Sequence, residues 1–112
     1  MQEIFVDTGA WLALADKRDQ YHGRATAVYP GILRQSTRLI TTNLVVAESY
    51  NLIRQRLGFE PGMRFLQSLR QSGRLERVYA DMELEITAEA ILQQFSDQSF
   101  SLVDAVSFAL MQ

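Results

Sequence analysis

Three acidic residues stand at positions where an ordinary amphipathic pattern predicts apolar side chains. Asp7 follows the apolar residues 4–6, Glu48 lies in an apolar stripe, and Asp104 precedes a strongly apolar segment. Carboxylates that converge from separated segments raise one another's pKa unless a cation neutralises them. Oxygen ligands without a histidine or cysteine partner favour Mg²⁺ or Mn²⁺ over zinc. Such an ion binds phosphate oxygens and activates water, so the three acids indicate phosphodiester hydrolysis.

Each of these acids also has a structural explanation. Asp7 can cap a helix that begins near Gly9, because a carboxylate at that position accepts bonds from backbone N–H groups. Glu48 can form an ion pair with Arg54 or Arg56, because a half-buried carboxylate without a partner is unfavourable. The sequence alone does not separate these roles from metal binding.

Asp104 has the strongest structural alternative. It stands three residues after Ser101, a spacing that forms a capping box and places a negative charge at a helix N-terminus. The apolar neighbours Phe100, Val103 and Phe108 nevertheless predict that this helix end is buried. A buried carboxylate gains more from a metal ion than from water, so Asp104 joins the predicted site.

An alternation of predicted strands and helices positions these acids. Strands are expected at residues 3–6, 38–42 and 75–79. Helices are expected at residues 9–15, from Asp19 to about Ser36, at 44–57, around 61–69, at 83–95, and from Ser101 onward. The second of these should kink or break at Pro30, and Asn43 should cap the third. The last is expected to be a buried core helix. This order predicts a parallel sheet with right-handed crossovers and helices on both faces. Asp7 then lies at the carboxyl end of a strand, where open parallel sheets bind ligands.

Length and composition restrict the class of protein. A chain of 112 residues has room for one domain, and 47% apolar with 21% charged residues is typical of a folded globular protein. The absence of cysteine excludes disulfides, thiolate zinc sites and cysteine nucleophiles. No targeting or membrane-spanning segment is visible, so we expect a cytoplasmic protein.

Arginine is concentrated in the middle of the chain, whereas the segment after Arg77 has acids and no lysine or arginine. Clustered guanidinium groups suit phosphate or carboxylate partners because they bond bidentately. A solvated helix face is the alternative explanation for such a run of charge.

Three short segments, FVDTGAW at residues 5–11, TTN ahead of VAE at 41–48, and DQSFSLVDA at 97–105, resemble the PIN domain, especially the VapC-like toxins. The resemblance extends along the whole chain. It implies a three-layer α/β/α fold with a short central parallel sheet and an acidic site for Mg²⁺ or Mn²⁺. It also implies endoribonuclease activity, homodimerisation and inhibition by the cognate antitoxin of a type II toxin–antitoxin pair.

The resemblance also assigns roles to individual residues. The positions that match the family's metal-binding acids, and that would be catalytic, are Asp7, Glu48 and Asp104. Thr8 and Asn43 match polar positions that line the same pocket, and Asp97 is a secondary candidate that a loop or capping role explains equally well. Apart from the resemblance, the arginine-rich middle segment is expected to hold the RNA backbone through Arg54, Arg56 and Arg64.

The sequence departs from the family pattern after its last predicted helix. The family continues to a further strand and a fourth acid, and this sequence stops at Gln112 with neither. We therefore expect a single PIN-like domain, residues 1–112, that is shortened at its C-terminus and has an exposed sheet edge.

Three other functions compete with the ribonuclease. A PIN remnant with weak or no catalysis would act as a dimerisation or antitoxin-binding module, using aromatic anchors such as Trp11, Tyr50, Phe59 and Phe65. An aspartyl phosphotransferase of the haloacid dehalogenase kind needs a second acid where this chain has Gly9. A serine hydrolase is poorly supported, because His22 is the only histidine and no nucleophile motif surrounds it.

Overall fold

A three-stranded parallel sheet forms the centre of the computed structural model, which describes residues 2–35 and 37–112. The strands β1 (Glu3–Phe5), β2 (Arg38–Thr42) and β3 (Leu75–Val78) lie in the order β1-β2-β3. In the register, Ile4 lies opposite Leu39, and Leu39 lies opposite Leu75. The α/β class and the parallel sheet are therefore confirmed, and β1 is an edge strand in the described part of the chain.

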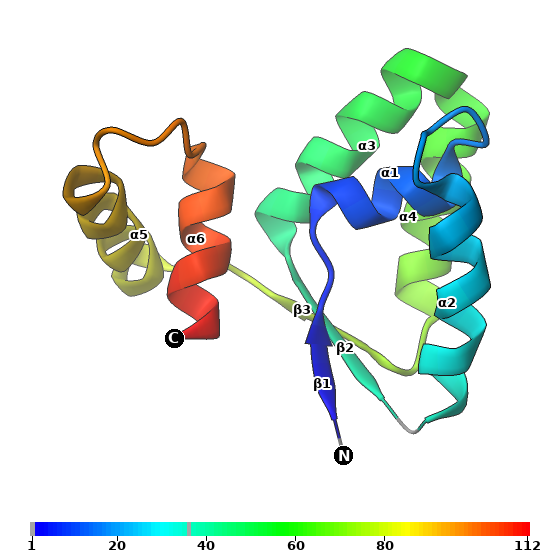
Figure 1. Ribbon diagram of the computed structural model, residues 1–112, viewed down its shortest axis with the longest axis horizontal. Helices are drawn as coiled ribbons and strands as arrows, with labels where there is room; N and C mark the ends of the chain where they lie inside the picture. The colour runs from blue at the N-terminus through cyan, green and yellow to red at the C-terminus, as the bar shows by residue number, and fades with distance from the viewer. Residues whose placement is uncertain (1, 36) are drawn as a thin grey trace.

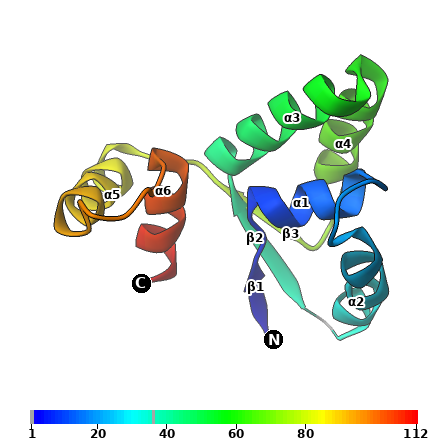
Figure 2. The ribbon, with the colours of Figure 1, turned by 45° about the horizontal axis from the view of Figure 1, so that its top comes forward.

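Helices lie on both sides of the sheet, as the sequence predicts (Figures 1 and 2). One side carries α1 (Thr8–Ala15), α2 (His22–Arg34), α3 (Asn43–Leu57) and α4 (Phe59–Gln71). The hairpin of α5 (Met82–Gln94) and α6 (Leu102–Met111) lies across the molecule from α2 and α4, where the chain leaves β3. The crossover from β1 to β2 and the crossover from β2 to β3 run in the same direction across the sheet. Because both crossovers have the same handedness, α1 to α4 lie on one face.

Two apolar clusters hold these layers together. The larger one joins the sheet to α1, α3 and α4 through residues such as Trp11, Leu39 and Phe65. The smaller one joins α5 to α6 through Ala88, Ile91, Ala105, Val106 and Ala109. Leu44 of α3 packs against the smaller cluster, and Val103 of α6 packs against the larger one. The N-terminal turns of α3 and α6 therefore connect the two clusters.

The start of α3 differs from the prediction that Asn43 caps it. Thr42 is the N-cap, and its Oγ1 accepts a hydrogen bond from Val45 N at 3.1 Å. The side chain of Asn43 instead accepts a bond from Ala80 N at 2.8 Å, which ties α3 to the segment after β3. Thr42 takes the capping role because β2 ends there in extended backbone, with its hydroxyl directed at the first turn of the helix.

The sequence predicts a kink or a break at Pro30, and the break is wrong, because α2 is continuous from His22 to Arg34 with Pro30 inside it. No residue of α2 is buried, so water can satisfy the backbone carbonyl that proline leaves without a donor. Asp19 does not cap this helix; its Oδ1 accepts a bond from Tyr21 N at 2.9 Å. Ser36, where the helix was expected to end, lies outside the described residues.

The expectation that α6 is a buried core helix is also wrong in part. Ala105 and Val106 are fully buried, whereas Leu102 is 45% and Met111 is 56% exposed. Within the described residues, α6 packs mainly against α5, so a single neighbouring helix covers only one of its faces (Figure 1). No helix of residues 2–35 or 37–112 is both long and apolar enough to cross a bilayer.

Gly58 provides a test of the turn between α3 and α4. Its φ of 107° lies in a region that residues with a Cβ rarely adopt, so Gly58→Ala should lower the free energy of unfolding by about 1–2 kcal/mol. Thermal denaturation followed by circular dichroism measures the change. Gly73→Ala is the matched control, because a Cβ at Gly73 meets no atom within 4 Å and its φ is not in that region. Equal melting temperatures for the two variants would contradict this account.

Candidate functional site

Asp7 lies at the carboxyl end of the sheet, between β1 and α1. It is the N-cap of α1, and its Oδ1 accepts a hydrogen bond from Ala10 N at 2.9 Å. On the neighbouring strand, Thr41 donates from its Oγ1 to Val6 O at 2.9 Å, which fixes the end of β1 beside the start of α3. The capping role proposed for Asp7 is therefore present, and the remaining carboxylate oxygen stays at the sheet edge.

Glu48 lies on the second turn of α3, about 7.5 Å along the helix axis from Asn43. It shares a helix face with Leu44, four residues earlier, and Leu44 packs against the α5–α6 cluster. Glu48 is thus half-buried on the side of α3 that faces α5 and α6. Among the described residues it has no ion pair and no side-chain hydrogen bond, so the structure gives no structural role to this carboxylate.

Asp104 lies on the first turn of α6 and forms the predicted capping box with Ser101. Ser101 N donates to Asp104 Oδ2 at 3.1 Å, and Asp104 N donates to Ser101 Oγ at 3.0 Å. The expectation that this end is buried is wrong, because Ser101, Leu102 and Asp104 are all exposed. The neighbouring Val103 packs on the larger core cluster, which turns this end of α6 toward the sheet.

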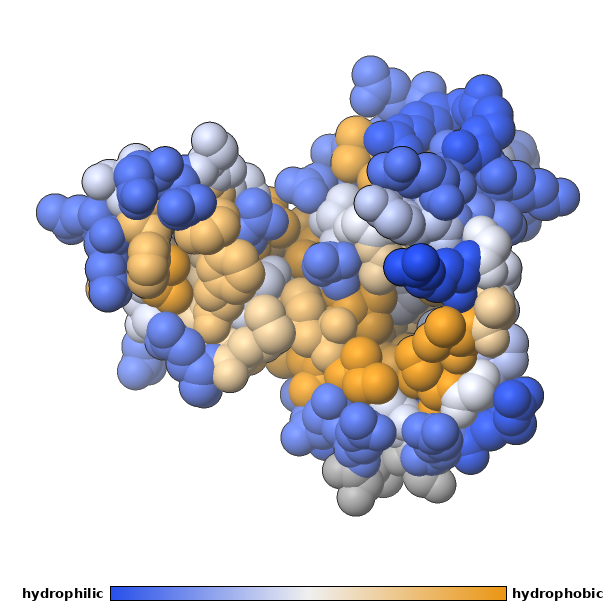
Figure 3. Space-filling view, in the orientation of Figure 1, coloured by the Kyte–Doolittle hydropathy of each residue, from blue (hydrophilic) through white to orange (hydrophobic). Residues whose placement is uncertain are grey.

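The surface is hollowed between the α5–α6 hairpin and α3, as Figure 3 shows. Within residues 2–35 and 37–112, however, no three acidic or histidine side chains lie close enough to hold a metal ion as a group. Asp7, Glu48 and Asp104 therefore do not form a closed cage in this structure, and their shared role stays a prediction. Mg²⁺ usually keeps several waters and binds through one or two carboxylates and substrate phosphates.

The side chains around Asp7 fit such a hydrated ion. Thr8 opens α1, and its buried Oγ1 has no hydrogen-bond partner in the described part of the chain. A buried hydroxyl without a partner costs about 1–3 kcal/mol, which a bound water or ion would offset. The donor set contains only oxygen, which suits Mg²⁺ or Mn²⁺.

Ser49, which the sequence did not single out, presents a second buried hydroxyl without a partner among the described residues. It is fully buried and follows Glu48 on α3. A serine inside a helix ordinarily bonds a backbone carbonyl of its own helix, so its type gives no signal in the sequence. Asp97, the secondary candidate, is exposed in the turn between α5 and α6.

The arginines predicted to bind RNA already contact other parts of the protein. The Arg54 guanidinium lies over the Phe59 ring, 5.1 Å from its centroid, and its Nη1 donates to Tyr50 Oη at 3.3 Å. Arg56 lies 4.0 Å from carboxylate oxygens of Asp16 and Asp19. The structure therefore gives both arginines a structural role, and their RNA-binding role stays a prediction.

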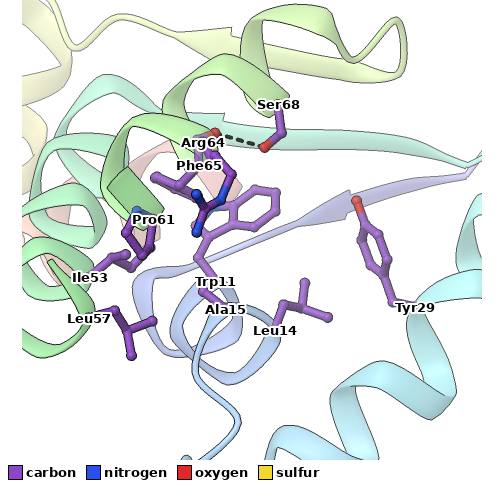
Figure 4. Close-up of a pocket in the computed structure, with 10 residues that line it drawn as sticks. All are labelled: Trp11, Leu14, Ala15, Tyr29, Ile53, Leu57, Pro61, Arg64, Phe65 and Ser68. Carbon is purple, nitrogen blue, oxygen red and sulfur yellow. Dashed lines mark hydrogen bonds between the residues drawn. The ribbon is translucent and has the colours of Figure 1, made fainter. Parts of the chain in front are cut away.

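Arg64 lies at a different hollow, a cavity of about 490 Å³ between α1, α3 and α4. Figure 4 shows Trp11, Tyr29 and Phe65 around it, together with aliphatic side chains. Trp11 and Phe65 pack edge to face with ring centroids 5.8 Å apart. This cavity is mostly apolar, so it suits an apolar side chain better than an RNA backbone.

Asp16 provides a pH-dependent test of the ionic cluster around Arg56. Its carboxylate is 5% exposed and accepts a bond from Arg18 N at 2.9 Å, and this bond and the nearby arginines lower its pKa. A carboxylate whose pKa is lower in the folded protein stabilises the fold at any pH above its pKa in the unfolded chain, about 3.9. This stabilisation is lost as the pH falls through the pKa of the folded protein. Asp16→Asn should therefore be less stable than the wild type at pH 7, with the difference shrinking below about pH 4. Urea unfolding at both pH values measures this; a difference independent of pH would contradict it.

Comparison with known proteins identifies relatives along the whole chain. The family model described as PIN domain matches residues 4–112. The 23S rRNA-specific endonuclease VapC20 of Mycobacterium tuberculosis is 33% identical over 111 residues, covering 97% of this chain and 80% of the relative. A VapC ribonuclease of Archaeoglobus fulgidus is 29% identical over 104 residues, and the match spans 65% of that protein's length.

A solved structure has the same fold. The crystal structure of M. tuberculosis VapC20, described as a sarcin–ricin loop cleaving toxin, superposes with a TM-score of 0.86 at 29% identity. The match covers 96% of this chain and 79% of the VapC20 chain. The arrangement of the sheet, the four helices on one side and the α5–α6 hairpin is therefore also that of a toxin nuclease.

Proposed function

Because the chain belongs to the PIN domain family, we propose that it is a metal-dependent endoribonuclease and the toxin of a type II toxin–antitoxin pair. The relatives are named as nucleases, which supports RNA phosphodiester hydrolysis. The observation that carries the proposal is Glu48. Asp7 and Asp104 cap helices. Glu48 has no partner within the described residues, and it shares a helix face with Leu44, which packs against the α5–α6 cluster.

The proposed ligands of Mg²⁺ or Mn²⁺ are Asp7, Glu48 and Asp104. A bound ion would offset phosphate charge and acidify water. The cap on α1 fixes the orientation of the Asp7 carboxylate, and the positive end of the α1 dipole favours an anionic phosphate there. The Thr8 hydroxyl can donate to a phosphate oxygen or hold a water. The Glu48 carboxylate has no ion pair or hydrogen bond within the described residues, so it is available to hold the ion.

A cleavage assay tests the proposal. Total RNA and 23S rRNA are incubated with the protein in Mg²⁺, in Mn²⁺ and in EDTA, and the fragments are resolved by electrophoresis. Cleavage at discrete sites that requires a divalent ion is the expected result. The 23S rRNA is the first substrate to test because the VapC20 relative is named for it. Intact RNA in all three conditions, with protein that circular dichroism shows to be folded, would contradict the nuclease.

The proposed partners are a cognate antitoxin and a second copy of the chain. The VapC20 crystal structure is described as that of a toxin, which supports the antitoxin. Within residues 2–35 and 37–112, β1 is an edge strand, and an edge strand offers backbone groups to another chain. Light scattering across a range of concentrations should give twice the mass of the chain, and a mass that stays at 12.8 kDa would contradict the dimer.

The alternative is a PIN module that binds a partner without cutting RNA. Two observations favour it: the three acids do not gather into a group within the described residues, and the cavity in Figure 4 presents aromatic rings. The cleavage assay separates the two functions. A chain that binds its antitoxin tightly and leaves RNA intact in Mn²⁺ would be this module.

A further inference from the structure

An exposed tyrosine with two nearby arginines lies beside β3, and the proposed function does not use it. Tyr79 directly follows β3 and is 59% exposed. Arg70, near the end of α4, donates from its Nη1 to Tyr79 Oη at 3.5 Å. The hydrogen bond from Arg70, with the positive charges of Arg70 and Arg77, lowers the pKa of the Tyr79 hydroxyl. These three residues, Arg70, Arg77 and Tyr79, form what we call the Tyr79 patch.

The arginines of the Tyr79 patch keep their charge available for a ligand. Neither Arg70 nor Arg77 forms an ion pair with an acid among residues 2–35 and 37–112. Glu76, the acid next to Arg77 in the sequence, is already paired with Arg38. An exposed aromatic ring beside unpaired guanidinium groups is the combination that binds a nucleotide, because the ring stacks on a base and the arginines pair with phosphates.

The patch begins at the same end of the sheet as Asp7, where the carboxyl ends of the strands lie. In the register, Val78 at the end of β3 lies opposite Thr42 at the end of β2. Two residues after Val78, the backbone N–H of Ala80 donates a hydrogen bond to Asn43 Oδ1. Neighbouring strands lie about 4.8 Å apart, so the carboxyl ends of β1 and β3 are separated by about 10 Å. If an RNA strand lies along the carboxyl ends of the strands with its cleaved bond at Asp7, a nucleotide next to that bond lies at Tyr79.

We propose that the Tyr79 patch is a subsite for a nucleotide flanking the cut, in which Tyr79 stacks on a base while Arg70 and Arg77 hold the RNA backbone. This inference rests on the proposed ribonuclease function and adds a positioning site to it. On the other flank of Tyr79, Asp81 and Glu83 line a cavity of about 310 Å³ and repel phosphate. The backbone therefore passes on the α4 side of the ring.

The test measures RNA binding separately from cleavage. Fluorescence anisotropy of a labelled single-stranded oligoribonucleotide is recorded in EDTA, so that metal-dependent turnover does not interfere. Tyr79→Ala should weaken binding about tenfold, and Tyr79→Phe should stay within about twofold because it keeps the ring. Arg77→Ala should make the slope of log K against log salt concentration shallower by about 1, the amount expected for the loss of one phosphate contact. Tyr21→Ala is the matched control, because Tyr21 is 56% exposed and lies at the start of α2.

The outcomes separate this inference from the proposed function. If the wild type cleaves RNA while Tyr79→Ala binds and cleaves like the Tyr21 control, the subsite is wrong and the nuclease stands. Loss of antitoxin binding by Tyr79→Ala with unchanged RNA affinity would show a protein contact and overturn the inference. A wild type that neither binds nor cleaves RNA would overturn both proposals. Circular dichroism confirms that each variant is folded.

Discussion

Asp7→Asn should reduce metal-dependent RNA cleavage by at least about 100-fold, because losing one carboxylate from a metal site removes several kcal/mol of charge stabilisation. The substitution isolates the charge. Asparagine caps helices as well as aspartate does, so the bond from Ala10 N to the side chain at position 7 is retained. Initial rates with a fluorescent RNA in Mn²⁺ give the ratio of the variant to the wild type.

Asp7→Ala is the comparison that separates catalysis from folding. It removes the cap as well as the charge and should lower the free energy of unfolding by about 1 kcal/mol, whereas Asp7→Asn should leave it nearly unchanged. Equal cleavage rates for Asp7→Asn and the wild type would show that Asp7 only caps α1.

Trp11→Ala should lower the free energy of unfolding by about 3–5 kcal/mol, the largest stability effect that we expect. Trp11 is 6% exposed, packs edge to face on Phe65, and its Nε1 lies 3.5 Å from Thr41 Oγ1. Replacing it leaves a cavity and removes the contact that holds α1 on the core. Because Asp7 caps α1, the same change should also displace the proposed metal site and lower the cleavage rate.

Urea unfolding followed by far-ultraviolet circular dichroism measures the stability effect, since the variant lacks the only tryptophan. Met82→Ala is the control, because Met82 is 77% exposed and its truncation should change the free energy of unfolding by less than about 0.5 kcal/mol. A loss below about 1 kcal/mol for Trp11→Ala would show that the packing around α1 is not important to the fold.

Alternation of apolar runs and helical periods predicted the class and order of the elements. The second strand was predicted at its observed bounds, Arg38–Thr42, because a β-branched run is followed by a clear helix start. The errors arose where neighbouring groups decide the outcome. Thr42 and Asn43 are both good caps, and only the position of Ala80 shows that Asn43 serves a tertiary contact. The exposure of α6 depends on what packs against it, which its own apolar sequence does not contain.

The candidate site was predictable only in part for the same reason. The sequence indicates that Asp7 follows a strand and that Asp104 opens a helix, because both features are local. The orientation of Glu48 depends on the contact of Leu44 with α5 and α6, which is a long-range property. Tyr79 gives no signal in the sequence, because its hydrogen bond to Arg70 joins the end of one strand to a preceding helix.

The most direct test of the shared metal site is Mn²⁺ binding measured by electron paramagnetic resonance, in the wild type and in Glu48→Gln. Glu48 has no cap, ion pair or hydrogen bond in the described residues, so this change should not disturb the fold. We expect Glu48→Gln to bind Mn²⁺ at least about tenfold more weakly than both the wild type and the exposed control Glu89→Gln. Unchanged Mn²⁺ affinity in Glu48→Gln would contradict the claim that separated acids of this chain hold one ion.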